Sequence, residues 1–410
     1  MEETKYSTPP SAWQLDKIMR IFLSDNPEER DLDIGLLCGD TGAILLQAAH
    51  YDASGDDACL MALESLLDHV LNKIEQETRL SPTFSDGLAG VGITILLLQE
   101  TTMIDRRDNE FFTDLDRYLG SVLDKSLREK HLDPLHGALG IATYFVKRKR
   151  TDIVNNVIRS LTAFRENSGR ETRFSYYYDD RLTWVYDLGL AHGMAGILSF
   201  LTTCCDAGFM ERECQEMISG IMTFYDNNTQ DHDLAGSWFG NFIQRDTYGQ
   251  QRRYETSRLA WCYGDLGILY SLYQAAGVVK DPARQKNYET MLTTTAGRTT
   301  YEQTFVENAG ICHGSSGIAM LYLLLYGQSG NKIFYDASEY WHDITRQLLS
   351  PIEYADPASY PFTKDTTADD IFKKGMLYGL TGIGFYLQLR QLFDQGKWES
   401  VNSWRSIFLI

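Results

Sequence analysis

Apolar residues recur along this chain at the spacing of α-helices. The clearest stripe has charged residues between its members and consists of Leu60, Leu63, Leu66, Leu67, Val70, Leu71 and Ile74. Spacings of three and four place such side chains on one face of a helix, which then packs against the rest of the protein. Similar patterns predict further amphipathic helices at 12–24, 110–129, 152–166, 211–225, 282–293 and 335–349.

Between these segments lie runs that are apolar on nearly all sides, each opened by a Gly-x-x-Gly motif. The first glycines of the seven copies are Gly39, Gly87, Gly137, Gly193, Gly264, Gly314 and Gly379. Repeats of about 50 to 70 residues are typical of stacked helical units or propellers, and the helical period favours the former. A helix that is apolar all round is buried. The pattern therefore predicts an all-α fold, a seven-fold double α/α barrel of about fourteen helices.

Two connections are longer than a link between helices requires, at 168–188 and 226–256, and both are rich in polar and aromatic residues. Long connections in compact domains are often functional. We expect small β-rich or loop insertions there, near the mouth of the barrel, within a single domain spanning residues 1–410.

The net charge of −18 at pH 7 excludes nucleic acid as the expected partner, because phosphate binding needs clustered Lys and Arg. The first residues lack the pattern of a signal peptide, and no apolar run is long enough to span a bilayer. Seven cysteines, an odd number, fit a reducing compartment better than a disulfide framework. We therefore expect a cytoplasmic protein.

In two consecutive repeats, cysteine and histidine residues that can act as soft metal ligands lie one or two positions before the first glycine. Cys262 precedes Tyr263-Gly264, and Cys312-His313 precede Gly314. If these repeats are neighbours in a ring, two thiols and one imidazole converge. Zinc prefers such donors, and a catalytic zinc site keeps a position open where a structural site has four protein ligands. The remaining cysteines are expected to be small buried hydrophobes: Cys38, Cys59, Cys204, Cys205 and Cys214.

Other polar residues fall at the same end of the predicted barrel. His192 and Tyr263 directly precede the first glycine of their repeats, and Asp133 and Arg258 lie a few residues earlier in theirs. A histidine at the barrel axis can act as acid or base near neutral pH, although a core imidazole is an equal alternative. Asp133 and Arg258 could instead form a structural ion pair. The sequence allows two interpretations of His136, either as a fourth metal ligand or as a residue that lines the site.

Three further aspartates are interpreted as residues at helix N-termini, where a carboxylate interacts favourably with the helix dipole. They are Asp40, Asp86 and Asp265.

The segments 190–196, 257–264 and 311–314, together with the seven Gly-x-x-Gly motifs, resemble the lanthionine synthetase C-like family over nearly the whole chain. The resemblance implies a zinc protein with a seven-fold double α/α barrel. Bacterial stand-alone members of the family cyclise dehydrated precursor peptides into lanthipeptides. The chain departs from the family at Leu266, where a proline is usual, and at His136, which matches no known family role.

Carried over to this chain, the resemblance implies Cys262, Cys312 and His313 as zinc ligands. It also implies His192, Asp133 and Arg258 as the active-site histidine, aspartate and arginine, with Tyr263 as the tyrosine after the first zinc cysteine.

The reaction implied by the resemblance joins a peptide cysteine to dehydroalanine or dehydrobutyrine. The thiolate adds to the β-carbon, and His192, oriented by Asp133, protonates the α-carbon. Arg258 stabilises the developing oxyanion. The implied partners are a dehydrated precursor peptide, leader plus core, and a companion dehydratase and exporter that would hold the protein at the inner membrane face.

Three alternatives stay open at this point. A related protein could add glutathione to dehydrated peptides, with the same chemistry at zinc. A non-catalytic peptide-binding barrel could use zinc for structure alone. An α/α-barrel glycosidase would use two carboxylates, such as Asp133 with Asp86 or Asp40, but would leave the cysteines and histidine unexplained.

Overall fold

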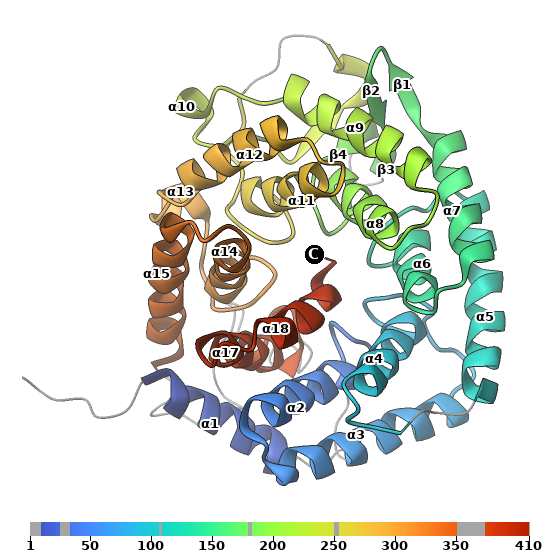
Figure 1. Ribbon diagram of the computed structural model, residues 1–410, viewed down its shortest axis with the longest axis vertical. Coiled ribbons are helices and arrows are strands. Elements are labelled where there is room, and N and C mark those ends of the chain that lie inside the picture. The colour runs from blue at the N-terminus through green and yellow to red at the C-terminus, as the bar shows by residue number, and fades with distance from the viewer. Residues whose placement is uncertain are drawn as a thin grey trace, which may run out of the picture.

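The computed structural model describes residues 10–24, 33–105, 109–178, 183–249, 254–350 and 374–409, and the statements below concern these residues. Two concentric rings of helices form an all-α toroid (Figure 1). The inner ring consists of α2 (Asp40–Ser54), α4 (Leu88–Glu100), α6 (Ala138–Lys147), α8 (Met194–Asp206), α11 (Asp265–Val278), α14 (Ser315–Ser329) and α17 (Leu380–Asp394). The predicted double barrel is confirmed.

The outer ring covers the inner one helix by helix (Figure 1). It consists of α1 (Pro10–Ser24), α3 (Asp57–Gln76), α5 (Asn109–Arg128), α7 (Thr151–Phe164), α9 (Glu211–Asn227), α12 (Pro282–Thr295) and α15 (Lys332–Leu349). All seven overlap the amphipathic segments predicted from the sequence. The stripe on α3 packs inward, with Leu63, Leu66, Leu67 and Val70 buried. The hydrophobic core therefore lies between the two rings.

An almost complete ring of backbone hydrogen bonds joins neighbouring repeats at the residue two positions before the first glycine of each motif, with a bond at six of the seven junctions. The bonds in the described residues run from the N–H of Leu37 to Ser85 O, Ser85 to Leu135 O, Ala191 to Cys262 O, Cys262 to Cys312 O, Cys312 to Leu377 O and Leu377 to Leu37 O. Their N···O distances lie between 2.9 and 3.3 Å. The last bond closes the circle, since it joins the seventh repeat to the first. The inner helices α17 and α2 pack side by side at this closure.

The motif glycines are required because the backbone passes very close to them. A Cβ added at Gly382, the second glycine of the seventh copy, would overlap the carbonyl oxygen of Met376. At Gly264 a Cβ would overlap the carbonyl oxygen of Arg258, and its φ of +90° is itself unfavourable for other residues. Each glycine thus lets the turn before an inner helix fold back against the start of that helix.

We expect Gly382→Ala to lower the free energy of unfolding by about 3 kcal/mol or more, because the obstructing atom is backbone and cannot move aside. Urea unfolding would measure the change. The matched control is Gly120→Ala in α5, where the nearest atom to the new Cβ is Phe145 Cζ at 3.9 Å. Alanine should be neutral there or stabilising by up to about 1 kcal/mol. Equal effects at both sites would contradict the close-approach argument.

Short strands occur where β-rich insertions were expected. An antiparallel hairpin pairs β1 (Glu166–Ser168) with β2 (Glu171–Arg173). A three-stranded antiparallel sheet, in the order β3-β4-β5, joins β3 (Tyr176–Tyr178), β4 (Thr183–Asp187) and β5 (Phe242–Gln244). Asp187 pairs with Phe242 at the last position of β4. The prediction of small β-rich insertions is confirmed.

The C-terminal segment returns to the centre of the ring. After α18 (Trp398–Arg405), the short helix η6 (Ser406–Phe408) ends close to the toroid axis (Figure 1). Phe408 is fully buried, and its carbonyl accepts a 2.9 Å hydrogen bond from Nε1 of Trp261, the residue before Cys262. None of the helices in the described ranges combines the length and apolar character needed to cross a lipid bilayer.

Candidate metal and catalytic site

The residues that directly precede the first glycines form a band of side chains around the barrel axis, which we call the girdle. It consists of Cys38, Asp86, His136, His192, Tyr263, His313 and Tyr378. Neighbours along the band contact one another. Asp86 Oδ2 lies 3.1 Å from His136 Nδ1, and the ring centroids of His136 and His192 are 5.7 Å apart. The repeat and its backbone ring thus bring residues from the whole chain to one place.

The rings of His192 and Tyr263 have centroids 6.1 Å apart, and those of His313 and Tyr378 lie 5.4 Å apart. Cys38 hydrogen-bonds Asp86 at the other side of the band. Cys38 was expected to be a buried hydrophobe, but it is only half-buried and belongs to the girdle. The other four cysteines of that set are buried as expected.

Cys262, Cys312 and His313 are brought together as one group. Their donor atoms all lie within 4.8 Å of one another, and both cysteines are almost completely buried. The backbone bond from Cys262 to Cys312 sets the two segments side by side. Two sulfurs and an imidazole are the donor set of zinc, and three protein ligands leave a position for water or substrate. The residues therefore fit a zinc ion.

The thiols of this group are placed so that one of them ionises readily. A hydrogen bond from Cys312 lowers the pKa of Cys262, and the nearby His313 and the positive charge of Arg258 act in the same direction against the cost of burial. The same hydrogen bond and burial raise the pKa of Cys312. A buried thiolate beside a second sulfur is the form that binds a soft cation.

A second group in the described residues, His50, Asp56 and Cys59, also has donor atoms within 4.8 Å of one another. Two of its members already have polar partners, since Asp56 caps α3 by accepting the N–H of Ala58 and His50 Nδ1 hydrogen-bonds Gln388. The group of Cys262, Cys312 and His313 fits a metal better. His136 lies outside both groups and pairs with Asp86.

His192 and Asp133 form a hydrogen-bonded pair. His192 Nδ1 lies 2.7 Å from Asp133 Oδ2, and the other carboxylate oxygen accepts the backbone N–H groups of Leu135 and His136. Burial opposes the charged imidazole, but the hydrogen bond and charge of Asp133 outweigh it and raise the pKa of His192. The imidazole therefore becomes protonated more readily than a free histidine, with Nδ1 engaged and Nε2 left for chemistry. Among the described residues, Asp133 pairs with His192 and not with Arg258.

Asp187 is a site residue that the sequence did not single out. Its Oδ2 accepts a 2.8 Å hydrogen bond from the Tyr263 hydroxyl, and its Oδ1 accepts the N–H of Gly189. Burial raises the pKa of Asp187 to about 6. Asp187 is the last residue of β4, so the strand insertion reaches the girdle and orients Tyr263. The signal available in the sequence was Asp187-Leu188-Gly189, a turn pattern shortly before His192.

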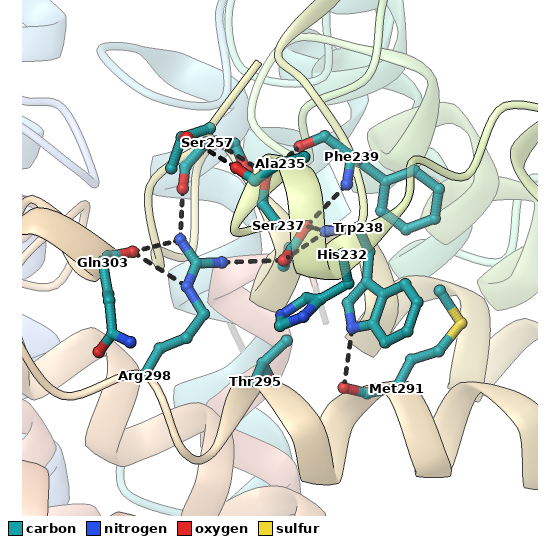
Figure 2. A network of polar contacts seen from close by, with 12 residues as sticks. His232, Ala235, Ser237, Trp238, Phe239, Ser257, Met291, Thr295, Arg298 and Gln303 are labelled. Atoms are coloured by element: carbon teal, nitrogen blue, oxygen red, sulfur yellow. Dashed lines mark hydrogen bonds and ion pairs between the residues drawn. The ribbon is translucent and has the colours of Figure 1, made fainter. Parts of the chain in front are cut away.

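Asp265 was expected to act only on the helix dipole, but it is the centre of a buried network. It begins α11, is fully buried and lies 2.8 Å from Nη1 of Arg298. The same carboxylate accepts the backbone N–H groups of Trp238 and Phe239. Figure 2 shows Arg298 also reaching the carbonyl oxygens of Ser257 and Gln303. The network ties the insertion around 237–239 to the segment that leads into Arg258 and Cys262.

We expect Arg298→Met to lower the free energy of unfolding by about 3–5 kcal/mol, because it leaves the buried Asp265 carboxylate without its counter-charge. Urea unfolding followed by circular dichroism would measure the loss. The control is Arg212→Met, which breaks an ion pair with Glu216 whose arginine is 88% exposed, and it should cost less than about 1 kcal/mol. A small effect at Arg298 would show that the network is not structurally important.

The chain matches known proteins over almost its full length. The sequence profile described as lanthionine synthetase C-like protein matches residues 13–123 and 106–402. The nisin biosynthesis protein NisC of Lactococcus lactis subsp. lactis is 22% identical over 398 residues, covering 90% of this chain and 91% of that protein. A solved structure of nisin cyclase superposes with a TM-score of 0.75 at 19% identity, covering 96% of this chain and 98% of the other. With its seven-fold toroid and its candidate metal-ligand group, the chain belongs to the lanthionine synthetase C-like family.

Proposed function

We propose that this protein is a zinc-dependent lanthionine cyclase that forms thioether rings in a dehydrated precursor peptide. The observation that carries the proposal is the presence of two chemical units, each of which contributes one imidazole to the girdle. One is the group Cys262, Cys312 and His313, and the other is the His192–Asp133 pair. The names of the two nisin proteins point to the same reaction.

The proposed reaction forms one C–S bond and is neutral in protons overall. The S–H bond of the substrate cysteine and the π bond between the α- and β-carbons of the dehydrated residue break, while the β-carbon gains the sulfur and the α-carbon gains a proton. Bound zinc, held by Cys262, Cys312 and His313, would keep the substrate sulfur in its nucleophilic thiolate form.

The protein's own residues would handle the proton and the developing charge. Asp133 holds Nδ1 of His192, so the proton on Nε2 is available for the α-carbon. Arg258, whose charge already acts on the cysteine pair, would stabilise the enolate oxygen. Tyr263 is held by Asp187 and would help to line the reacting space.

The proposed partner is a precursor peptide with a leader and a dehydrated core. By the same reasoning, a companion dehydratase and an exporter would bring the single-domain protein to the cytoplasmic face of the membrane. These partners follow from the proposed activity and would be found through pull-down with the precursor peptide.

Ring formation tests the proposal directly. A peptide with one dehydroalanine and one cysteine would be incubated with the protein, and free thiols would be counted by alkylation and mass spectrometry. Loss of the thiol without change of peptide mass supports a cyclase. A gain of one glutathione, when glutathione is supplied, supports the glutathione-adding alternative. Binding of the peptide with neither change supports a non-catalytic barrel.

A further inference from the structure

Two imidazole–carboxylate pairs lie next to each other in the girdle, and the proposed function uses only one of them. His136 Nδ1 lies 3.1 Å from Asp86 Oδ2, just as His192 Nδ1 lies 2.7 Å from Asp133 Oδ2. In each pair the carboxylate belongs to the repeat that precedes the histidine. Each of these two histidines is therefore held by a carboxylate from the preceding repeat, although Asp86 and Asp133 occupy different positions in their repeats.

The two imidazole rings are stacked on each other. Their centroids are 5.7 Å apart and their planes differ by 15°, an arrangement that is favourable for aromatic rings. Tyr263, the next girdle residue, has its ring centroid 6.1 Å from that of His192, with the planes at 35°. His192 therefore lies between two rings of the girdle.

A direct link also joins the two pairs. One oxygen of Asp133 accepts the backbone N–H of His136 at 2.7 Å, and its other oxygen binds the His192 ring. His136 therefore contacts His192 in two ways. Its backbone N–H binds the Asp133 carboxylate that holds His192, and its own ring stacks on the His192 ring.

His192 needs such support because its surroundings are open. Its side chain is 35% exposed and that of His136 is 42% exposed, so core packing does not fix either ring from all sides. Rotation of a histidine ring about χ2 has a broad energy profile. The hydrogen bond to Asp133 fixes one atom of the ring, and a flat neighbour restricts rotation about that bond.

We propose that His136, held by Asp86, is a positioning residue that fixes the ring plane of His192 for proton transfer. The inference rests on the proposed cyclase function. Proton delivery to the α-carbon requires the donor nitrogen to stay aligned with the reacting carbon. His136 acts through His192 and supplies a ring face, which another flat side chain can replace.

The experiment compares His136→Ala with His136→Phe, which keeps a flat ring but loses the bond to Asp86. In the ring-formation assay, His136→Ala should lower kcat about tenfold while KM and zinc content stay unchanged. His136→Phe should restore kcat to within about threefold of wild type. The kcat of Asp86→Asn should lie between those of the alanine and phenylalanine variants. The control is His131→Ala, an exposed histidine on the same loop that lies outside the girdle. A wild-type kcat in His136→Ala, or equal losses in the alanine and phenylalanine variants, would overturn the proposal.

Imidazole ¹⁵N–¹H NMR separates failure of this inference from failure of the proposed function. The His192 signals, assigned by their absence in His192→Ala, should show one ordered ring in the wild type, with a sharp Nδ1–H signal from the hydrogen bond to Asp133. They should broaden in His136→Ala and sharpen again in His136→Phe. Absence of ring formation by the wild type would refute the cyclase proposal, whereas unchanged His192 signals in His136→Ala would refute the positioning role.

Discussion

Cys312→Ala is expected to abolish zinc binding and, with it, ring formation. Cys312 is almost completely buried, and its thiol hydrogen-bonds Cys262, so alanine removes one of the three donors and the partner that keeps Cys262 ionised. The affinity for zinc should fall by more than about a hundredfold, beyond the usual cost of losing a residue that only contacts a ligand. Metal analysis after dialysis should find one zinc per wild-type chain and none in the variant.

The control for this experiment is Cys204→Ala. Cys204 is a fully buried cysteine of α8 that lies outside the metal-ligand group, so its loss should reduce stability but leave zinc content unchanged. Wild-type protein without zinc would refute the cyclase proposal. Zinc retained by Cys312→Ala would refute the assignment of the ligand.

The second large effect is expected for His192→Ala, which should keep zinc but lose ring formation by a factor of about 10²–10⁴, the usual contribution of a general acid. The variant removes the only imidazole of the girdle that the proposed reaction uses as proton donor, while the three metal ligands stay in place. Single-turnover ring formation with zinc-loaded protein would measure the loss.

Asp133→Asn serves as the matched comparison for His192→Ala. Asparagine keeps the shape of the side chain but removes the charge that raises the pKa of His192. The rate of ring formation should therefore fall less than in His192→Ala, by about 10- to 100-fold. Combining both changes should be little worse than His192→Ala alone, because the two residues act as a unit. A His192→Ala variant that cyclises normally would exclude His192 from the mechanism.

The fold and the convergence of Cys262, Cys312 and His313 could be predicted because both depend on equivalent positions in a repeat. The backbone ring fixes the residue two positions before each first glycine, so Cys262 and Cys312 must be neighbours once the repeats close. The next residue of each repeat points into the same space, which explains why His192, Tyr263 and His313 could be grouped from the sequence.

Asp133 was expected to orient His192 from the family resemblance alone, and the other carboxylate partners could not be predicted, because the positions of these carboxylates in the repeat differ. Asp86, Asp133 and Asp187 support His136, His192 and Tyr263, but they lie one, four and six residues before the first glycine of their own repeats. Only the length and direction of each side chain decide which carboxylate reaches which ring. For the same reason, the ion pair between Asp265 and Arg298 could not be predicted, because the sequence showed only that Asp265 lies at a helix N-terminus.

The closure of the backbone ring between Leu37 and Leu377 has a consequence for synthesis of the chain. The ribosome needs about 20–70 s to add the residues between these two at 5–20 residues per second. During that time the ring cannot close, and α2 lacks the helix α17 that packs against it in the finished structure. The segments that carry Cys262 and Cys312 are synthesised before the ring can close. Of the inner helices, α2 therefore waits longest for a neighbour that packs against it in the finished ring.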